Sequence, residues 1–455
     1  PRLDRPRDKR LDHAVARDKK APQADKKAPP ADLNKPPKDK ALPPVDVASP
    51  PLDKAPLKPD LPCQDPGVIL SAGLGIWPSN LAVGGKATVT YPAQGTLGGG
   101  ANLTLHYGFN YWSQDLGGGA KNKELAMKKL PGGGFSATVT LPQGAKLLDA
   151  VFYSISGGSK TWDNNNSADW HRSIADPLLG PYLTLRDNLG GAGGVSRDPA
   201  HSVTINFRSD RVCQGKVQYG TSPGALTKQV SESVSGVDHH LHIPGTLAAD
   251  TRYYYRTACL DLGAACKVPS YSGVRSFRTP PKNLANFKMA LLADPQDNGL
   301  AGDKWAQIAA ALVKAPHADA RLVLIAGDLA GDDKPERWWT FFHHGRELFA
   351  TRPLLPVVGN HDTPTFGSHA DTTSFEKLFS LGSSSGKDTY WALRYGSAAF
   401  IGLNSETAQS WVSTSDWKPG GKQYTWLQGA LAKLPAAATW RFAAWHIPPY
   451  NAGVR

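Results

Sequence analysis

The chain has 455 residues and a mass of 48.7 kDa, with 46 Gly, 37 Pro and 40% hydrophobic residues. This length predicts several domains, and no apolar run reaches the roughly 18 residues of a transmembrane helix. Lys and Arg outnumber Asp and Glu by 51 to 39, a formal net charge of +12. No helix or strand combines clustered Arg with interleaved aromatic residues, so the sequence predicts no nucleic-acid partner.

Residues 1–64 predict a disordered linker. Asp recurs every seventh residue from Asp18 to Asp60, and proline pairs such as Pro29-Pro30 close several repeats. A proline in every repeat excludes a continuous helix, and with it a coiled coil. The segment is expected to be a polyproline-rich spacer, serving either as a plain connector or to hold the folded part away from a cell wall or membrane.

The four cysteines predict disulfides. Cys63, Cys213, Cys259 and Cys266 show no Cys-x-x-Cys spacing, which argues against a zinc ribbon or a thioredoxin-like site. An even number of cysteines fits an oxidising compartment, so an extracellular, periplasmic or cell-surface location is expected, although the chain shows no signal peptide after Pro1. Three pairings are open, and the sequence does not choose among them.

Residues 65–175 predict a β-sandwich. Gly-rich turns separate runs that predict strands at Lys86–Tyr91, Asn102–Tyr107, Phe135–Leu141 and Leu147–Ser154. Trp112 follows the strand that carries His106, and Trp162 opens a turn-rich run. Exposed indole rings beside Asn and Asp suit a sugar, because flat aromatic faces stack on sugar rings. The alternative is that both indole rings only pack inside the sandwich.

Three segments of this part, "LHYGFNYW", "GGFSATVTLPQGAKLLDAVF" and "TWDNNNSADWH", resemble starch-binding β-sandwich modules. The resemblance implies that His106, Trp112 and Trp162 form a carbohydrate-binding platform. It also implies a glycan partner, such as a starch-like α-glucan.

Residues 181–281 predict a second sandwich, with strands at Ser202–Arg208, Gly215–Tyr219, His240–Pro244, Arg252–Cys259 and Gly273–Arg278. The run from Asp250 to Tyr255 is typical of a corner that leads into a sandwich strand. This part resembles the fibronectin-III-like module that precedes the catalytic domain of purple acid phosphatases, which implies spacing and docking. His239, His240 and His242 could bind a metal, but without a further ligand a solvated strand edge is the favoured interpretation.

Residues 286–455 predict an α/β layered domain. Apolar runs that suit buried strands alternate with helical stretches. The predicted strands are Lys288–Ala293, Leu322–Ala326, Leu355–Val358, Ala398–Leu403 and Arg441–Trp445. The predicted helices are Asp303–Lys314, Pro335–Ala350 and Tyr424–Leu434.

Residues of metal-ligand type follow four of these strands: Asp294, Asp328, the tetrapeptide Gly359-Asn360-His361-Asp362, and His446. Functional sites in open α/β sheets gather at the carboxyl ends of the strands. Carboxylate, amide and imidazole ligands together suit Mn, Fe or Zn better than Ca. The spacing therefore predicts one metal site built from four distant segments.

This ordered set resembles the calcineurin-like metallophosphoesterase superfamily, which includes the purple acid phosphatases. The resemblance implies hydrolysis of a phosphorylated substrate by a pair of divalent or trivalent metal ions (Fe, Mn or Zn). Asp294, with Gln296, would bind the first metal, Asp328 would bridge the two, and Asn360 and His446 would bind the second. His361 would stabilise charge or protonate the leaving oxygen, and Asp362 would orient His361.

The sequence departs from this family at three points. Gln296 stands where most members have His, and Gly331 stands where purple acid phosphatases have a metal-binding Tyr. The family's later Gly-His-x-His motif is absent before Arg455, so the catalytic domain is expected to be incomplete at its C-terminus. The alternative to an enzyme is a non-catalytic carbohydrate-binding surface protein with a phosphatase-like relic domain.

Overall fold

The computed structural model describes residues 68–70, 73–78, 80–112, 122–189, 197–261, 269–296, 304–364, 371–383, 386, 388–406, 414–436 and 438–448. The predicted linker of residues 1–64 lies outside the described residues. Within these ranges, no helix has the length and apolar character needed to cross a membrane.

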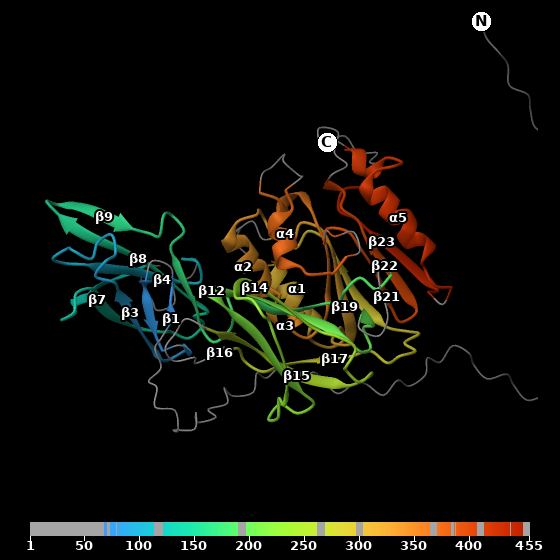
Figure 1. The fold of residues 1–455 in the computed structure, drawn as a ribbon, viewed down its shortest axis with the longest axis horizontal. Coiled ribbons are helices and arrows are strands. Elements are labelled where there is room, and N and C mark those ends of the chain that lie inside the picture. Colours follow the sequence, from blue (N-terminus) through green and yellow to red (C-terminus); the bar gives the residue numbers. More distant parts are fainter. Residues whose placement is uncertain are drawn as a thin grey trace, which may run out of the picture. The chain divides into compact units, whose positions relative to one another are not determined.

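Residues 68–173 form two antiparallel sheets (Figure 1). The first has the order β1 (Val68–Ile69), β2 (Gly75–Trp77), β3 (Lys86–Tyr91), β7 (Phe135–Thr140), β6 (Lys128–Lys129). The second has the order β10 (Trp170–Ser173), β8 (Leu147–Ser156), β4 (Thr104–Phe109), β5 (Lys123–Ala126), with β9 (Ser159–Asp163) also paired to β8. The four predicted strands are present.

The alternation of residues explains this sandwich. In β3 the side chains of Ala87, Val89 and Tyr91 are buried, while Lys86 is exposed. Buried residues from both sheets belong to one hydrophobic cluster, as expected for two sheets packed face to face.

The next strands are β11 (Leu179–Thr184), β12 (Val203–Gly220), β13 (Lys228–Ser231), β14 (Gly236–Ile243), β15 (Arg252–Leu260), β16 (Ser270–Tyr271) and β17 (Arg275–Arg278). The two strands predicted at 202–208 and 215–219 are one strand of 18 residues, β12. Its first half pairs with β14 and its second half with β15. The sequence could not reveal this continuity, because the buried positions between the two halves carry the polar residues Ser209 and Arg211.

The C-terminal part contains β18 (Lys288–Leu292), α1 (Lys304–Leu312), β19 (Ala320–Ala326), α2 (Pro335–His344), α3 (Arg346–Phe349), β20 (Leu354–Val357), α4 (Thr373–Leu378), β21 (Trp391–Tyr395), β22 (Ala398–Gly402), α5 (Lys422–Ala432) and β23 (Trp440–Ala444). Strands β18, β19 and β20 are parallel neighbours. The helix predicted at 335–350 is divided at Gly345, where an added Cβ would lie 2.2 Å from the ring of Phe349.

A sheet and a hydrophobic cluster cross the boundary predicted near residue 281. Thr184 of β11 pairs in parallel with Leu354 of β20, so one sheet runs from β18 through β11 to β12. One hydrophobic cluster includes buried residues of both parts. Strand pairing across the predicted boundary therefore joins the second module to the C-terminal part.

Candidate functional site

Three strand ends bring acidic and imidazole ligands together. Asp294 follows β18, Asp328 follows β19 and His446 follows β23, and their ligand atoms all lie within 4.8 Å of one another. The parallel pairing of β18 and β19 places two of these ends at one sheet edge. The Asp294 N–H also donates to the carbonyl of Gly327 at 3.2 Å. The convergence expected from the sequence is thus present for these three residues.

The backbone at these ends is left-handed. Asp294 and Asp328 have φ angles of 51° and 52°, and Gly327 has 88°. A Cβ added at Gly327 would lie 2.4 Å from the His446 ring, so only glycine permits this approach. Non-glycine residues in this conformation are uncommon and gather at functional sites.

Hydrogen bonds orient the His446 ring. Its Nδ1 lies 3.0 Å from the Ala326 carbonyl, to which it donates. Its Nε2 lies 3.2 Å from both Asp328 Oδ1 and Asn360 Oδ1. Burial alone would lower the pKa of His446, but the hydrogen bond and charge of Asp328 outweigh it and raise the pKa to about 9. The oxygens around Nε2 therefore create a negative potential that favours a cation.

The donor set fits metal ions, and Gln296 supplies a direct indication. Its Oε1 is buried and has no hydrogen-bond partner within the described residues. An unpaired buried oxygen is costly unless a ligand satisfies it. Gln296 stands two residues after Asp294, and carboxylate, amide and imidazole ligands together suit Mn, Fe or Zn.

His361 is held by backbone groups next to Asp328. Its N–H donates to Asp328 Oδ1 at 3.0 Å, and its ring Nδ1 lies 2.6 Å from the Gly331 carbonyl. The ring Nε2 lies 4.0 Å from Asp328 Oδ2. Burial would raise the pKa of Asp328, but the hydrogen bonds from His446 and from the His361 N–H lower it overall.

Asp362 does not take the position expected for the partner that orients His361. Its Oδ1 accepts from the Ala330 N–H at 3.0 Å and its Oδ2 from the Gly359 N–H at 2.8 Å. The carboxyl group is fully buried, and burial raises its pKa well above the usual value. The partner of the His361 Nδ1 is Gly331, because the Asp362 side chain turns back between the two loops that carry Asp328 and Asn360.

Sequence reasoning missed a polar group after β22. Ser405 Oγ accepts from the Ile447 N–H, next to His446, at 2.9 Å and donates to Glu406 Oε1 at 3.2 Å. Glu406 is fully buried, and its charge helps to raise the pKa of His446. The strand-end rule that identified the other four segments would also have found Asn404-Ser405-Glu406.

The aromatic residues predicted to bind sugar lie together in the first sandwich. The rings of His106 and Trp112 stack at 25° with centroids 5.5 Å apart, and Trp162 stands at 89° to His106 at 5.5 Å. Trp162 lies on β9, not in a turn, but 44% of it is exposed. A pocket of about 260 Å³ is lined by His106, Trp112, Asn122, Val151, Trp162, Asn164 and Asp169.

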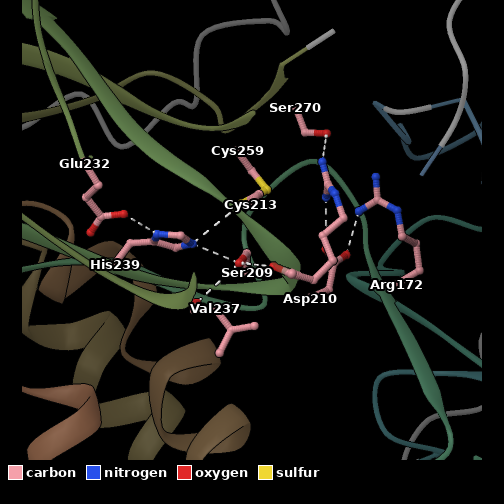
Figure 2. The surroundings of a disulfide bond; sticks show 10 residues. Arg172, Ser209, Asp210, Cys213, Glu232, Val237, His239, Cys259 and Ser270 are labelled. Atoms are coloured by element: carbon pink, nitrogen blue, oxygen red, sulfur yellow. Dashed lines mark hydrogen bonds and ion pairs between the residues drawn. A yellow bond between two sulfur atoms is a disulfide. The ribbon is translucent and has the colours of Figure 1, made fainter. Parts of the chain in front are cut away.

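His239 and His240 of β14 are engaged in hydrogen bonds, which corrects the expected solvated edge for these two residues. Figure 2 shows the buried His239 between Glu232 and Ser209, at 2.6 and 2.9 Å, beside the disulfide of Cys213 and Cys259. His240 uses both ring nitrogens in hydrogen bonds to Asn206 and the Lys377 carbonyl. Rings with both nitrogens engaged offer no lone pair to a metal.

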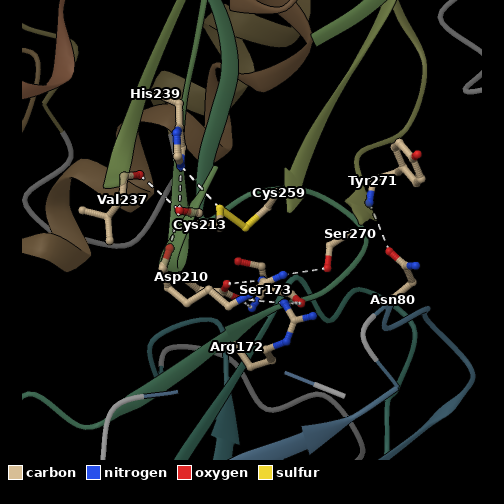
Figure 3. Close-up of polar contacts among 12 residues, drawn as sticks. Asn80, Arg172, Ser173, Asp210, Cys213, Val237, His239, Cys259, Ser270 and Tyr271 are labelled. Atoms are coloured by element: carbon tan, nitrogen blue, oxygen red, sulfur yellow. Dashed lines mark hydrogen bonds and ion pairs between the residues drawn. A yellow bond between two sulfur atoms is a disulfide. The ribbon is translucent and has the colours of Figure 1, made fainter. Parts of the chain in front are cut away.

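Charged residues join the first sandwich to the second module. Figure 3 shows Arg172 and Asp210, whose side chains pair at 2.7 Å, and Asn80, which accepts from the Tyr271 N–H at 3.1 Å. Burial would raise the pKa of Asp210, but Arg172 and Arg211 lower it to about 2. These contacts explain why a buried carboxylate is tolerated here.

Parts of this chain are similar to a protein family and to known proteins. The sequence model of the calcineurin-like phosphoesterase family matches residues 287–455. The probable purple acid phosphatase 20 of Arabidopsis thaliana is 28% identical over 215 residues, which are 46% of this chain and 44% of the relative. An alpha-amylase of Clostridium acetobutylicum is 36% identical over 92 residues, which are 20% of this chain and 10% of the amylase.

The chain spans less than half the length of these curated relatives. Among solved structures, a purple acid phosphatase from yellow lupin (Lupinus luteus) seeds has a TM-score of 0.48 at 12% identity, covering 79% of this chain and 69% of that chain. The similarity to calcineurin-like phosphoesterases thus covers residues 287–455, which are less than half of the chain.

Proposed function

We propose that this protein hydrolyses a phosphorylated substrate with two metal ions held at the strand ends of its C-terminal domain. The observation that carries the proposal is the convergence of Asp294, Asp328 and His446 within 4.8 Å. When bound, two metal ions neutralise the charge on the phosphoryl group and supply a hydroxide at neutral pH. Fe, Mn and Zn all suit this donor set.

The protein's own residues divide between two metal sites. Asp294 and the unpaired Oε1 of Gln296 would hold the first ion, while Asn360 and His446 would hold the second. Asp328 would serve both, because its Oδ1 faces His446 Nε2 at 3.2 Å and its Oδ2 faces His361. A carboxylate between two cations reduces their mutual repulsion.

His361 would act on the substrate. The Gly331 carbonyl accepts the proton of Nδ1, so Nε2 is the atom that faces the site. From there the ring can donate a hydrogen bond to the phosphoryl group or a proton to the leaving oxygen.

The test measures p-nitrophenyl phosphate hydrolysis and Mn²⁺ binding by calorimetry in parallel. We expect His361→Ala to lower kcat at least 100-fold with Mn²⁺ binding retained, and Asp328→Asn to weaken Mn²⁺ binding. His317→Ala is the matched control, because His317 is exposed and lies outside the segments that form the candidate site. Unchanged activity in His361→Ala would show that the site is assigned wrongly.

A second proposed function is glycan binding by the first sandwich, which would bring the phosphoesterase domain to a glycan outside the cell. The pocket with Trp112, Trp162 and His106 supports it, as does the similarity to a protein named alpha-amylase. The disulfide of Cys213 and Cys259 fits an extracellular, periplasmic or cell-surface location.

Retention on an amylose column tests the glycan proposal. Trp162→Ala should abolish retention, while Trp440→Ala, at an exposed tryptophan on β23, should leave it unchanged. Retention on amylose without any turnover of phosphoesters would favour the alternative of a binding protein with a relic domain. Equal retention of both variants would show that this pocket does not bind amylose.

A further inference from the structure

The turn that follows β4 of the first sandwich is strained. Asn110, Tyr111 and Trp112 are three consecutive non-glycine residues with φ angles of 57°, 55° and 57°. Left-handed residues normally occur singly, because Cβ approaches the following carbonyl. Such a run persists only where the surroundings hold it.

The start of the turn is held by Asn110, which is 1% exposed. Its Oδ1 accepts from the Lys146 and Leu147 N–H groups at 2.8 and 3.2 Å, and its Nδ2 donates to the Gly144 carbonyl at 3.2 Å. These bonds tie the first residue of the turn to the start of β8. They do not determine where the turn ends.

The end of the turn is held by Asp149 of β8, which is fully buried. Its Oδ2 accepts from the Trp112 N–H at 2.8 Å, and its Oδ1 lies 2.7 Å from the Nδ1 of His171 on β10. The carboxylate thus has one oxygen for the strained turn and one for a neighbouring strand. Burial is the largest influence on its pKa, which is raised.

Two further contacts position the indole ring of Trp112 in the pocket. A Cβ added at Gly108 would lie 2.5 Å from this ring, so the indole rests directly on the backbone of β4. The Trp112 Nε1 donates to Asp169 Oδ2 at 3.0 Å. Ring and backbone are both set before any ligand arrives, which lowers the ordering cost of binding.

We propose that Asp149 is a positioning residue that holds the Asn110–Trp112 turn in its strained form and so keeps the Trp112 ring in the sugar pocket. The inference rests on the proposed glycan function for its biological meaning, but the position of the ring does not depend on it. Without an acceptor for the Trp112 N–H, the turn relaxes to a favoured backbone conformation. The indole then leaves its place beside His106.

The test compares Asp149→Ala with Asp149→Asn. Alanine removes both acceptors, whereas asparagine keeps one oxygen that can accept from the Trp112 N–H. Protein labelled with 5-fluorotryptophan reports on the ring by ¹⁹F NMR, and Trp112→Phe identifies the signal. Binding of maltoheptaose is measured by calorimetry on the same samples, with Asp250→Asn, at an exposed aspartate whose left-handed backbone asparagine also tolerates, as control.

We expect Asp149→Ala to shift the Trp112 signal and to weaken maltoheptaose binding at least tenfold, and Asp149→Asn to restore both to within about threefold. If Asp149→Ala does not unfold cooperatively, Asp149→Leu fills the same volume without an acceptor and is read in the same way. An unshifted Trp112 signal in these variants overturns the proposal, as does an asparagine variant as impaired as alanine. The wild type could also fail to bind maltoheptaose while Asp149→Ala still shifts the Trp112 signal. That outcome would support the positioning role of Asp149 and refute the glycan proposal.

Discussion

Asp362 shows at the scale of one residue how the site is held. Its two oxygens each accept a backbone N–H, one from Ala330 and one from Gly359, and nothing of the carboxyl group is exposed. These two backbone positions belong to the loops that carry Asp328 and Asn360. A single buried side chain therefore connects the two loops that carry these proposed metal ligands.

Asp362→Asn should weaken Mn²⁺ binding. The amide presents one acceptor, so its NH₂ group must face a backbone N–H, and an unsatisfied buried donor costs about 1–3 kcal/mol. Loss of a group that supports metal ligands typically weakens metal affinity roughly 10–100-fold. Calorimetric titration with Mn²⁺ and urea unfolding measure both effects. The same change at the exposed Asp250 should alter neither, and equal behaviour of the two variants would contradict the role given to Asp362.

At the scale of elements, the site depends on how closely two strand ends approach. Gly359, after β20, has an ordinary extended backbone, with φ −116° and ψ 173°. An added Cβ would lie 2.1 Å from the Asp328 backbone nitrogen. Glycine is required here by the neighbouring loop and not by its own conformation.

Gly359→Ala should therefore displace the Asp328 loop. We expect a loss of about 1–3 kcal/mol in the free energy of unfolding, as for other overpacked interiors, together with weaker Mn²⁺ binding. Gly429→Ala in α5 is the matched control, because a Cβ there meets nothing within 4 Å. Alanine in that open helical position should stabilise by up to about 1 kcal/mol. Chemical denaturation measures the free energy of unfolding of both variants. A Gly359→Ala variant with the stability and Mn²⁺ affinity of the wild type would show that a side chain at this position does not displace the Asp328 loop.

At the scale of the whole molecule, aromatic and charged side chains join the first sandwich to α2 and its neighbours. Tyr111 lies 5.6 Å from Trp339, and Trp339 stacks on His343 at 4.4 Å. Asp176 pairs with Arg346 at 3.0 Å and with Arg275 at 3.3 Å. Such contacts bury groups whose ionisation changes the stability of the assembled chain.

His343 should make the protein less stable in mild acid. Burial, followed by Arg346, His344 and Lys146, lowers its pKa from 6.5 to about 2. The folded state keeps the ring neutral while the unfolded chain takes up a proton, so this contribution is complete above pH 6.5 and is lost as the pH falls toward 2. At pH 5 the loss amounts to about 2 kcal/mol.

Urea unfolding at pH 7.5 and pH 5 checks this for the wild type and His343→Leu. The variant should lose about 2 kcal/mol less than the wild type between the two values, because the other titrating groups are common to both. His317→Leu, at an exposed histidine, should keep the wild-type difference. A variant with the full wild-type loss would show that His343 is not the group responsible.

Much of the architecture could be predicted because it depends on patterns of neighbouring residues in the sequence. The alternation in Lys86–Tyr91 predicted the bounds of β3, and the apolar runs before Asp294 and Asp328 predicted strands that end at the site. β19 is buried as expected, but the expected burial of β18 is wrong, because Leu291 is 68% exposed. The gathering of these ends at one edge follows from parallel strand geometry. Residue types with local consequences can be recognised without a structure.

Other features depend on partners that are distant in sequence. The single strand β12 and its connection through β11 to β20 required knowledge of which strands pair. The true partners of Asp362 and of His239 and His240 are backbone or side-chain groups from loops, a helix and a strand that are distant in the sequence or lie in other elements. The sequence did not identify Asp149 as a positioning residue, because the role proposed for it depends on the backbone N–H of Trp112, 37 positions away.

The amino-acid order by itself determined the kinds of elements, the ligand types at the strand ends and the chemistry that these ligands suit. Only the tertiary structure decided the pairing of Cys213 with Cys259, the continuity of the large sheet and the residue that each buried carboxylate supports. The physical reason is that periodicity and residue chemistry act over a few neighbours, whereas hydrogen-bond partners of buried polar groups are chosen by the packing of segments far apart in the chain.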